Sequence, residues 1–279
     1  MRVVEYDPSR RAEIAGLMGR VWGSRPDERE LAWFYERNPL RPASVLLAHV
    51  GGRAVATVAI HFTRMSIAGE TLEVGMPLRV ATDPEYRGRG IFARLEAENE
   101  ERVGALGIRL LLTVPNAASA PVFLGRLGWR RLPSLRLWAR VRPRAGRLRG
   151  ARRVERFGEL PARAAEGDRV LRDPAWLNWR FADSPSSYRL LESDGYAVTG
   201  QRGRLGVLAC LEGDLLAQAA SVADGAVLLA SPPPPRRAAY ALAGYLPSPR
   251  SFALLGKGLD PAQAVPARPH FELGDLDFL

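Results

Sequence analysis

Residues Leu78–Phe92 read LRVATDPEYRGRGIF, and this segment decides which fold and which kind of site the chain is expected to have. An apolar, strand-like run ends at Asp83-Pro84, and the loop Arg87–Gly90 then leads into a helical pattern. A turn from a strand into a helix points several unpaired backbone N–H groups at one place, where the helix dipole adds positive charge. We therefore expect an anion such as a phosphate to bind at this loop.

The residues inside the loop support this expectation. Gly88 and Gly90 permit a positive φ and a close approach of the backbone to a phosphate, while Arg87 and Arg89 have side chains long enough to reach it. The segment lacks the Gly-Lys-Ser/Thr of a nucleotide P-loop, and it is not a full dinucleotide-binding fingerprint. A different class of phosphate-bearing ligand is therefore expected.

Elements predicted on both sides of the loop give a mixed α/β fold. The first half reads as a helix that starts at Asp7-Pro8 and has an apolar stripe from Ile14 to Trp22, followed by a second helix at about 27–37. Then come strands at 44–50, 54–65 and 71–82, a helix after Gly90, a strand at 109–114, a helix at 117–127 and a strand at 135–141. Because a helix joins the strands at 71–82 and 109–114, these should be parallel neighbours with a right-handed crossover.

The second half repeats the same order of elements. Residues 142–157 are rich in Arg, Pro and Gly and are predicted to be a linker between a domain at 1–141 and a lobe at 158–279. Strands are expected at 188–192, 196–200, 205–211, 226–230 and 251–255, with helices at 214–220 and 236–244. Only the first half has a glycine-rich loop after its third strand. The fold class is therefore α/β, an α+β mixed sheet in two related lobes.

The loop Arg87-Gly88-Arg89-Gly90 resembles the acyl-CoA pyrophosphate loop of the GNAT acyltransferase family, whose signature is Arg/Gln-x-x-Gly-x-Gly/Ala. Phe92 stands where the family usually has Gly or Ala. The stretch from Asn116 through Ser119 to Leu127-Gly128-Trp129 resembles a later motif of the same family. The resemblance covers about residues 1–141, and the repeated second half is similar to two-lobed bacterial members with a degenerate second GNAT-like lobe.

This resemblance implies an N-acyltransferase with acetyl-CoA as its cosubstrate. The acetyl or short acyl group would pass directly to a primary amine of a small molecule, amino-sugar or peptide. The pantetheine arm of CoA would lie between the separating strands 71–82 and 109–114. The cofactor-binding residues that it implies are Val80, Thr82, Arg87, Gly88, Arg89, Gly90, Ile91, Phe92, Asn116, Ser119 and Phe123.

Two residues are candidates for the general base. Glu73 lies on the strand before the loop, where family enzymes often have a glutamate, and His61 lies on the preceding strand with a side chain that titrates near neutral pH. Many members have a tyrosine as general acid in the helix after the later motif. Here that position is Phe123 or Leu124, depending on the alignment, and neither can donate a proton.

Composition leaves two other functions open, a CoA-binding regulatory protein without turnover and an arginine-rich nucleic-acid binder. The net charge of +10 favours the latter, but only one of the 40 basic residues is lysine, which is typical of a genome-wide codon bias. The single cysteine, Cys210, excludes an internal disulfide, and no metal is expected. We expect a cytoplasmic protein without a membrane helix and with a small-molecule amine as its acceptor, while its oligomeric state stays open.

Overall fold

The computed structural model describes residues 1–141, 150–161 and 167–276. They divide into two units, the first consisting of Met1–Arg64, Leu72–Leu132 and Leu254–Ala267 and the second of the remaining described residues. The expected boundaries therefore need correction, because 133–141 belongs to the second unit and Leu254–Ala267 to the first. Within the expected linker 142–157, Arg152–Val154 forms a strand and 142–149 lies outside the described residues. No helix in the described ranges is both long and apolar enough to cross a membrane.

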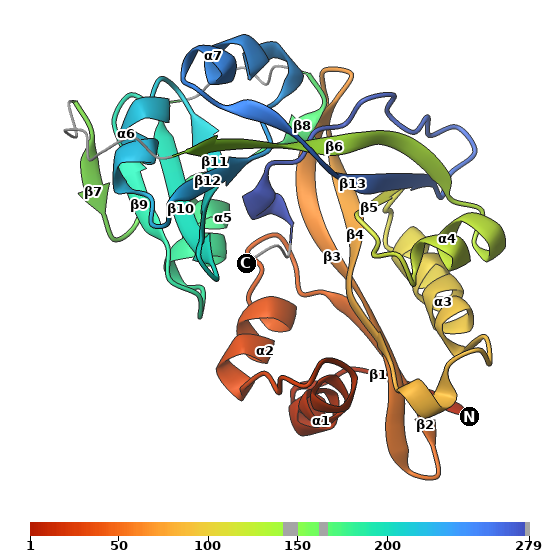
Figure 1. Cartoon of the computed structure of the whole chain (residues 1–279). Coiled ribbons are helices and arrows are strands. Elements are labelled where there is room, and N and C mark those ends of the chain that lie inside the picture. The colour runs from red at the N-terminus through yellow and green to blue at the C-terminus, as the bar shows by residue number, and fades with distance from the viewer. Residues whose placement is uncertain (142–149, 162–166, 277–279) are drawn as a thin grey trace. The chain divides into compact units, whose positions relative to one another are not determined.

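The first unit contains a mixed sheet with the strand order β1-β2-β3-β4-β5-β13 (Figure 1). The strands are β1 (Arg2–Glu5), β2 (Ser44–Val50), β3 (Arg53–Ile67), β4 (Glu70–Thr82), β5 (Leu110–Thr113) and β13 (Leu246–Gly258). Strands β4 and β5 are parallel neighbours, which confirms the prediction for 71–82 and 109–114. β1, which the sequence did not predict, pairs antiparallel with β2.

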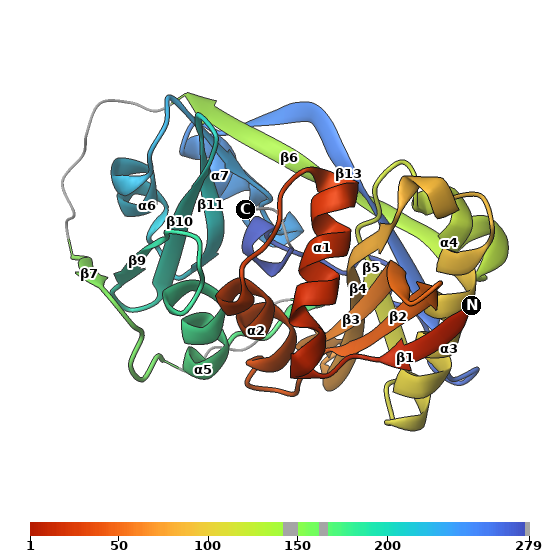
Figure 2. The same ribbon diagram turned by 90° about the horizontal axis from the view of Figure 1, so that it is seen from below.

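Four helices cover this sheet, and an aspartate side chain caps the start of one of them. They are α1 (Arg11–Trp22), α2 (Glu28–Glu36), α3 (Ile91–Ala105) and α4 (Ala120–Arg126). Asp7 caps a 3-10 turn just before α1, and Asp27 accepts a hydrogen bond from the backbone of Glu30 at the start of α2. Figures 1 and 2 show α1 and α2 on one face of the strands and α3 and α4 on the other. Apolar side chains of α3 pack against β2 and β3.

The last strand of each sequence repeat does not pair with strands of its own repeat but with a strand of the other repeat. β6 (Arg130–Val141) pairs through residues 138–141 with β12 of the second unit, whereas residues 255–258 of β13 pair with β5 of the first. Both pairings are antiparallel. The predicted repeat of elements is therefore present, but its two final strands are exchanged.

The second unit has a sheet with the order β6-β12-β11-β10-β9-β7. Apolar side chains of α6 and α7 pack on this sheet, and Tyr240 is among the most buried of them. The elements are β7 (Arg152–Val154), β8 (Arg169–Val170), α5 (Pro174–Leu177), β9 (Arg189–Glu192), β10 (Tyr196–Arg202), β11 (Leu205–Glu212), α6 (Leu216–Val222), β12 (Val227–Ala230) and α7 (Arg237–Leu242).

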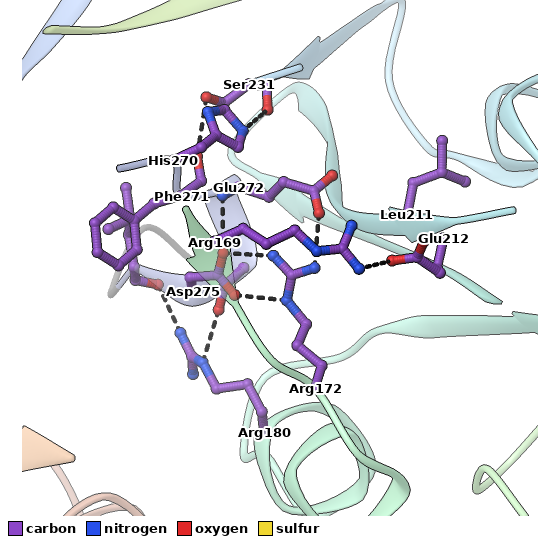
Figure 3. Close-up of polar contacts among 12 residues, drawn as sticks. Arg169, Arg172, Arg180, Leu211, Glu212, Ser231, His270, Phe271, Glu272 and Asp275 are labelled. Carbon is purple, nitrogen blue, oxygen red and sulfur yellow. Dashed lines mark hydrogen bonds and ion pairs between the residues drawn. The ribbon is translucent and has the colours of Figure 1, made fainter. Parts of the chain in front are cut away.

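A buried ionic cluster fixes the segment 270–276 within this second unit (Figure 3). Arg172 lies 2.8 Å from a carboxylate oxygen of Glu272 and 2.5 Å from one of Asp275. Arg180 donates to the backbone carbonyl of Gly274 at 2.9 Å. Burial raises the pKa of Glu272 to about 7, and the nearby Arg172 opposes that shift. The described end of the chain is thus held by charged groups that are largely removed from water.

Candidate active site

A cavity of about 580 Å³ lies in the first unit between β4, the loop after β4 and the start of α4. Most of the residues expected to bind acyl-CoA line this cavity, although they come from three separate segments of the chain. Its lining consists of Val21, Trp22, Val80, Thr82, Tyr86, Arg87, Gly88, Gly90, Ile91, Phe92, Ala93, Asn116, Ala118, Ser119, Pro121, Val122 and Arg126.

The separation of β4 from β5 gives the cavity its place in the sheet. The parallel pairing joins Val74 to Leu110 and Gly75 to Leu111. β4 then continues to Thr82, seven residues beyond that last paired position, without a further β5 partner among the described residues. Val80 and Thr82 lie in this unpaired part of β4 and line the cavity. An extended ligand can therefore meet the exposed edge of β4 at these residues.

Asp83 anchors the loop that follows β4. Its carboxylate is buried and accepts a hydrogen bond of 2.8 Å from Nε of Arg20 in α1. It also accepts a longer bond from the backbone N–H of Glu85, at 3.3 Å. The hydrogen bond from Arg20 is the main reason why the pKa of Asp83 lies below its usual value. The loop thus begins from a fixed, ionised side chain.

The glycines of the loop adopt the conformation that only glycine takes up readily. Gly88 and Gly90 both have φ of 74°, and Gly90 is the N-cap of α3. The first turn of α3 leaves backbone N–H groups without helical partners next to the cavity. Because α3 is a long helix, its dipole adds positive charge at the same end, which suits an anion.

Two arginines add positive charge to this end of the cavity. Arg87 lines it and donates from Nε to the carbonyl of Thr82 at 3.1 Å. Arg126, at the end of α4, has a guanidinium nitrogen 3.6 Å from the point where a Cβ on Gly90 would lie. Neither side chain makes an ion pair with a carboxylate in the described part of the chain. Both charges are therefore available to an anionic ligand.

The sequence predicts that Arg89 contacts the ligand, but in the structure its side chain contacts the loop itself. Its guanidinium donates to the carbonyl of Glu85 at 3.0 Å and lies 5.0 Å from the ring centre of Tyr86. It does not line the cavity. In this structure Arg89 braces the loop, and Arg126 provides the second charge instead.

Asn116 and Ser119 form the other wall of the cavity. The side-chain oxygen of Asn116 accepts backbone hydrogen bonds from Ala118 at 3.0 Å and Ser119 at 2.9 Å. These bonds fold the chain into a tight turn immediately before α4. Asn116 therefore shapes the wall, which explains why an asparagine followed by small residues precedes this helix.

Phe123, expected at the cofactor, belongs to the hydrophobic core. It is 1% exposed and packs edge-on against Phe92 and Trp129, with ring centres 5.3 Å and 4.8 Å away. Only Phe92 of this group lines the cavity. Phe123 thus supports the wall from behind.

The two candidate bases lie outside the lining of the cavity. The carboxylate of Glu73 forms an ion pair of 2.8 Å with Arg41. His61 is buried, and its ring centre lies 4.0 Å from that of Phe34 in α2. The structure therefore brings together the residues expected around CoA, except Arg89 and Phe123, but does not bring Glu73 or His61 into the same lining.

Sequence reasoning missed eight lining residues, which are Val21, Trp22, Tyr86, Ala93, Ala118, Pro121, Val122 and Arg126. Tyr86 lies inside the quoted segment, so its proximity to the loop could have been found from the sequence. Four more, Ala93, Ala118, Pro121 and Val122, lie next to or between predicted residues in the sequence. Val21, Trp22 and Arg126 come from the ends of α1 and α4, and only the tertiary packing brings them to the loop. In the arginine-rich stretch 126–156, the described residues Arg152 and Arg156 form ion pairs within the second unit.

Comparisons with known proteins agree with this geometry. The family model described as an acetyltransferase (GNAT) domain matches residues 3–132. A protein of Escherichia coli strain K12, described as the uncharacterised N-acetyltransferase YjhQ, is 29% identical over 119 residues. That match covers 41% of this chain and 64% of the relative, so the chain spans less than two thirds of the relative's length.

Solved structures are similar over nearly the whole chain. A GCN5-related N-acetyltransferase from Kribbella flavida has a TM-score of 0.68 at 16% identity, covering 96% of this chain and 73% of its own. A tandem GNAT protein from the clavulanic acid biosynthesis pathway has a TM-score of 0.58 at 14% identity, covering 94% and 99%. At these identities the likeness concerns the fold, and it extends to tandem GNAT architecture. The acetyltransferase (GNAT) domain model thus matches residues 3–132, somewhat less than half of this chain, and the solved structures named above share its fold.

Proposed function

We propose that the chain is an acyl-CoA-dependent N-acyltransferase that transfers an acetyl or short acyl group to a primary amine. The observation that carries this proposal is the single cavity that runs from the unpaired edge of β4 to the N-terminus of α3. One end offers backbone groups to an extended arm, and the other offers N–H groups and arginines to phosphates. Acyl-CoA has the same two parts, a pantetheine arm and a nucleotide pyrophosphate.

Each end of the cavity suits one part of this cosubstrate. Val80 and Thr82 would pair with the amides of the pantetheine arm, as a neighbouring strand would. Arg87, Arg126 and the first turn of α3 would hold the pyrophosphate. The glycines allow the phosphates to approach the backbone closely, and Asn116 with Ser119 would border the arm on its other side.

The transfer itself would be direct. The amine nitrogen attacks the thioester carbonyl, a C–N bond forms and the C–S bond breaks, which gives an amide and CoA thiol. The proton lost by the amine balances the proton gained by the thiolate. Glu73 and His61 remain the proposed bases, because Glu73 lies on β4, one of the two separating strands, and His61 lies on β3, the other neighbour of β4 in the sheet. The identity of the amine acceptor is a further part of the proposal, with a small molecule, amino-sugar or peptide as candidates.

A second candidate function is acyl-CoA binding without turnover. The buried, non-polar Phe123 favours it, because this position cannot protonate a leaving thiolate. The cavity would be the same in both cases, so only turnover distinguishes them. A thiolate is a moderate leaving group, and loss of the acid is expected to slow the transfer rather than abolish it.

A thiol-release assay tests the proposal. Purified protein is incubated with acetyl-CoA and, separately, glycine, lysine, spermidine or glucosamine, and the release of CoA thiol is followed. We expect amine-dependent release with at least one acceptor, reduced about tenfold or more in Arg87→Ala and unchanged in Arg109→Ala, which removes an exposed arginine remote from the cavity lining. Acetyl-CoA binding without release for any amine would favour the second candidate.

A further inference from the structure

Arg79 has a backbone conformation that is unusual for its residue type. It lies inside β4, yet its φ is 51°, in the left-handed region. A side chain with a Cβ is disfavoured in that region, and such residues persist where surrounding contacts hold them. The sequence offers no glycine here. The conformation therefore needs a compensating set of contacts.

The side chain of Arg79 provides those contacts through α2. One guanidinium nitrogen lies 2.7 Å from Oε1 of Glu30, and the guanidinium carbon lies 3.8 Å from the ring centre of Phe34. The Arg79 side chain is only 11% exposed and that of Glu30 31%. A flat guanidinium can make an ion pair at its edge and stack through its face at the same time, which lysine cannot do.

We call the contacts of Arg79 with Glu30 and Phe34 the clamp. The clamp starts from a residue of β4 that lies close to the cavity in the sequence. Residue 79 lies between Gly75, where the pairing with β5 ends, and Val80, which lines the cavity. A left-handed residue within a strand redirects the backbone groups that follow it. The conformation of residue 79 therefore sets the direction of the edge of β4 at the start of the cavity.

We propose that Arg79 is a positioning residue, which uses Glu30 and Phe34 to hold α2 against the left-handed turn of β4 and thereby fixes the edge of β4 that faces the bound acyl chain. The effect on acyl-CoA rests on the proposed function. The clamp between α2 and β4 is a property of the fold and can be tested without any ligand.

Four substitutions separate the side chain from the backbone. Arg79→Gly removes the clamp but accepts a positive φ, so it tests the side chain alone. Arg79→Lys keeps the charge for Glu30 and loses the stacking on Phe34, and Glu30→Gln loses the ion pair and keeps the stacking. Arg29→Ala is the matched control, because it removes an exposed arginine from the same helix.

Hydrogen exchange followed by mass spectrometry measures the clamp directly. We expect Arg79→Gly to speed exchange about tenfold in the peptides 28–36 and 76–82 while leaving 91–105 of α3 unchanged. Arg79→Lys and Glu30→Gln should give smaller increases in the same two peptides, and Arg29→Ala none. If Arg79→Gly does not fold, the two milder variants decide the question.

Titration with acetyl-CoA then connects the clamp to the site. Affinity should fall about threefold or more in Arg79→Gly and stay at the wild-type value in Arg29→Ala. Exchange equal to wild type in all variants, a uniform increase that includes α3, or undiminished affinity despite faster exchange in 76–82 would each overturn the positioning role. A wild-type protein that does not bind acetyl-CoA contradicts the proposed function, while the exchange measurement still decides whether the clamp exists.

Discussion

The carboxylate of Asp83 accepts a hydrogen bond of 2.8 Å from Nε of Arg20, and this contact ties the end of α1 to the start of the loop beside the cavity. Arg20 also donates to the backbone carbonyl of Ala54 at 2.7 Å, so that α1, β3 and the loop meet at one side chain. Asp83 is buried, whereas its neighbour Glu85 is exposed. The two acids should therefore contribute very differently to stability.

Replacement of Asp83 by asparagine should lower the free energy of unfolding by about 1–2 kcal/mol, because a buried charged hydrogen bond is lost. The same change should weaken acetyl-CoA binding, since the loop loses its fixed starting point. Chemical denaturation and calorimetry measure the two effects. Glu85→Gln is the control and should change stability by less than about 0.5 kcal/mol, as is usual for exposed ion pairs. Equal effects of the two substitutions would contradict the anchoring role of Asp83.

Glu96 in α3 should make stability depend on pH. Its carboxyl is buried without a hydrogen-bond partner among the described residues, and this burial, with the charge of Glu100, raises its pKa well above 4.5. Above pH 4.5 the unfolded chain loses the proton while the folded chain keeps it. The contribution of Glu96 to the free energy of unfolding therefore falls as the pH rises, until the folded carboxyl ionises.

The variant Glu96→Gln lacks this dependence. Its free energy of unfolding relative to wild type should rise between pH 5 and pH 7, by up to about 1.4 kcal/mol per pH unit. Urea denaturation at a series of pH values provides the comparison, with Glu98→Gln as an exposed control on the same helix. Parallel curves for wild type and Glu96→Gln would show that Glu96 keeps an ordinary pKa in the folded protein.

Phe123 should matter for stability much more than for ligand contact. Phe123→Ala removes a ring packed between Phe92 and Trp129 and should cost about 3–5 kcal/mol. Phe123→Leu keeps most of the volume, and acetyl-CoA affinity should stay within about twofold of wild type, because this side chain does not line the cavity. Thermal unfolding and calorimetry measure both. A well-folded Phe123→Leu protein that cannot bind acetyl-CoA would contradict this prediction and would favour a direct contact between Phe123 and the cofactor.

Local patterns predicted most of the helices and strands, but not the sheet that each final strand joins. The runs that became β6 and β13 have strand-like composition, and nothing in their residues encodes which partner strand they pair with. The exchange between the units therefore could not be predicted. β1 is only four residues long and becomes a strand through its pairing with β2.

The cavity shows the same limit on a smaller scale. Gly88, Gly90 and Arg87 are adjacent in the sequence, so their proximity follows from the loop itself. Arg126 comes from the end of another helix, and only the packing of α4 brings it beside Gly90. The sequence also gives no sign that the side chain of Arg79 meets Glu30 and Phe34, or that residue 79 has a positive φ.

Binding of acetyl-CoA at the glycine loop is the central claim, and calorimetric titration of wild type against the double variant Arg87→Ala/Gly90→Ala tests it most directly. Arg87→Ala removes a charge from the cavity, and Gly90→Ala places a Cβ on a residue with φ of 74° beside Arg126. The account predicts saturable binding to wild type and at least about tenfold weaker binding to a folded double variant. Equal affinity of the two proteins, or no binding to wild type, would contradict it.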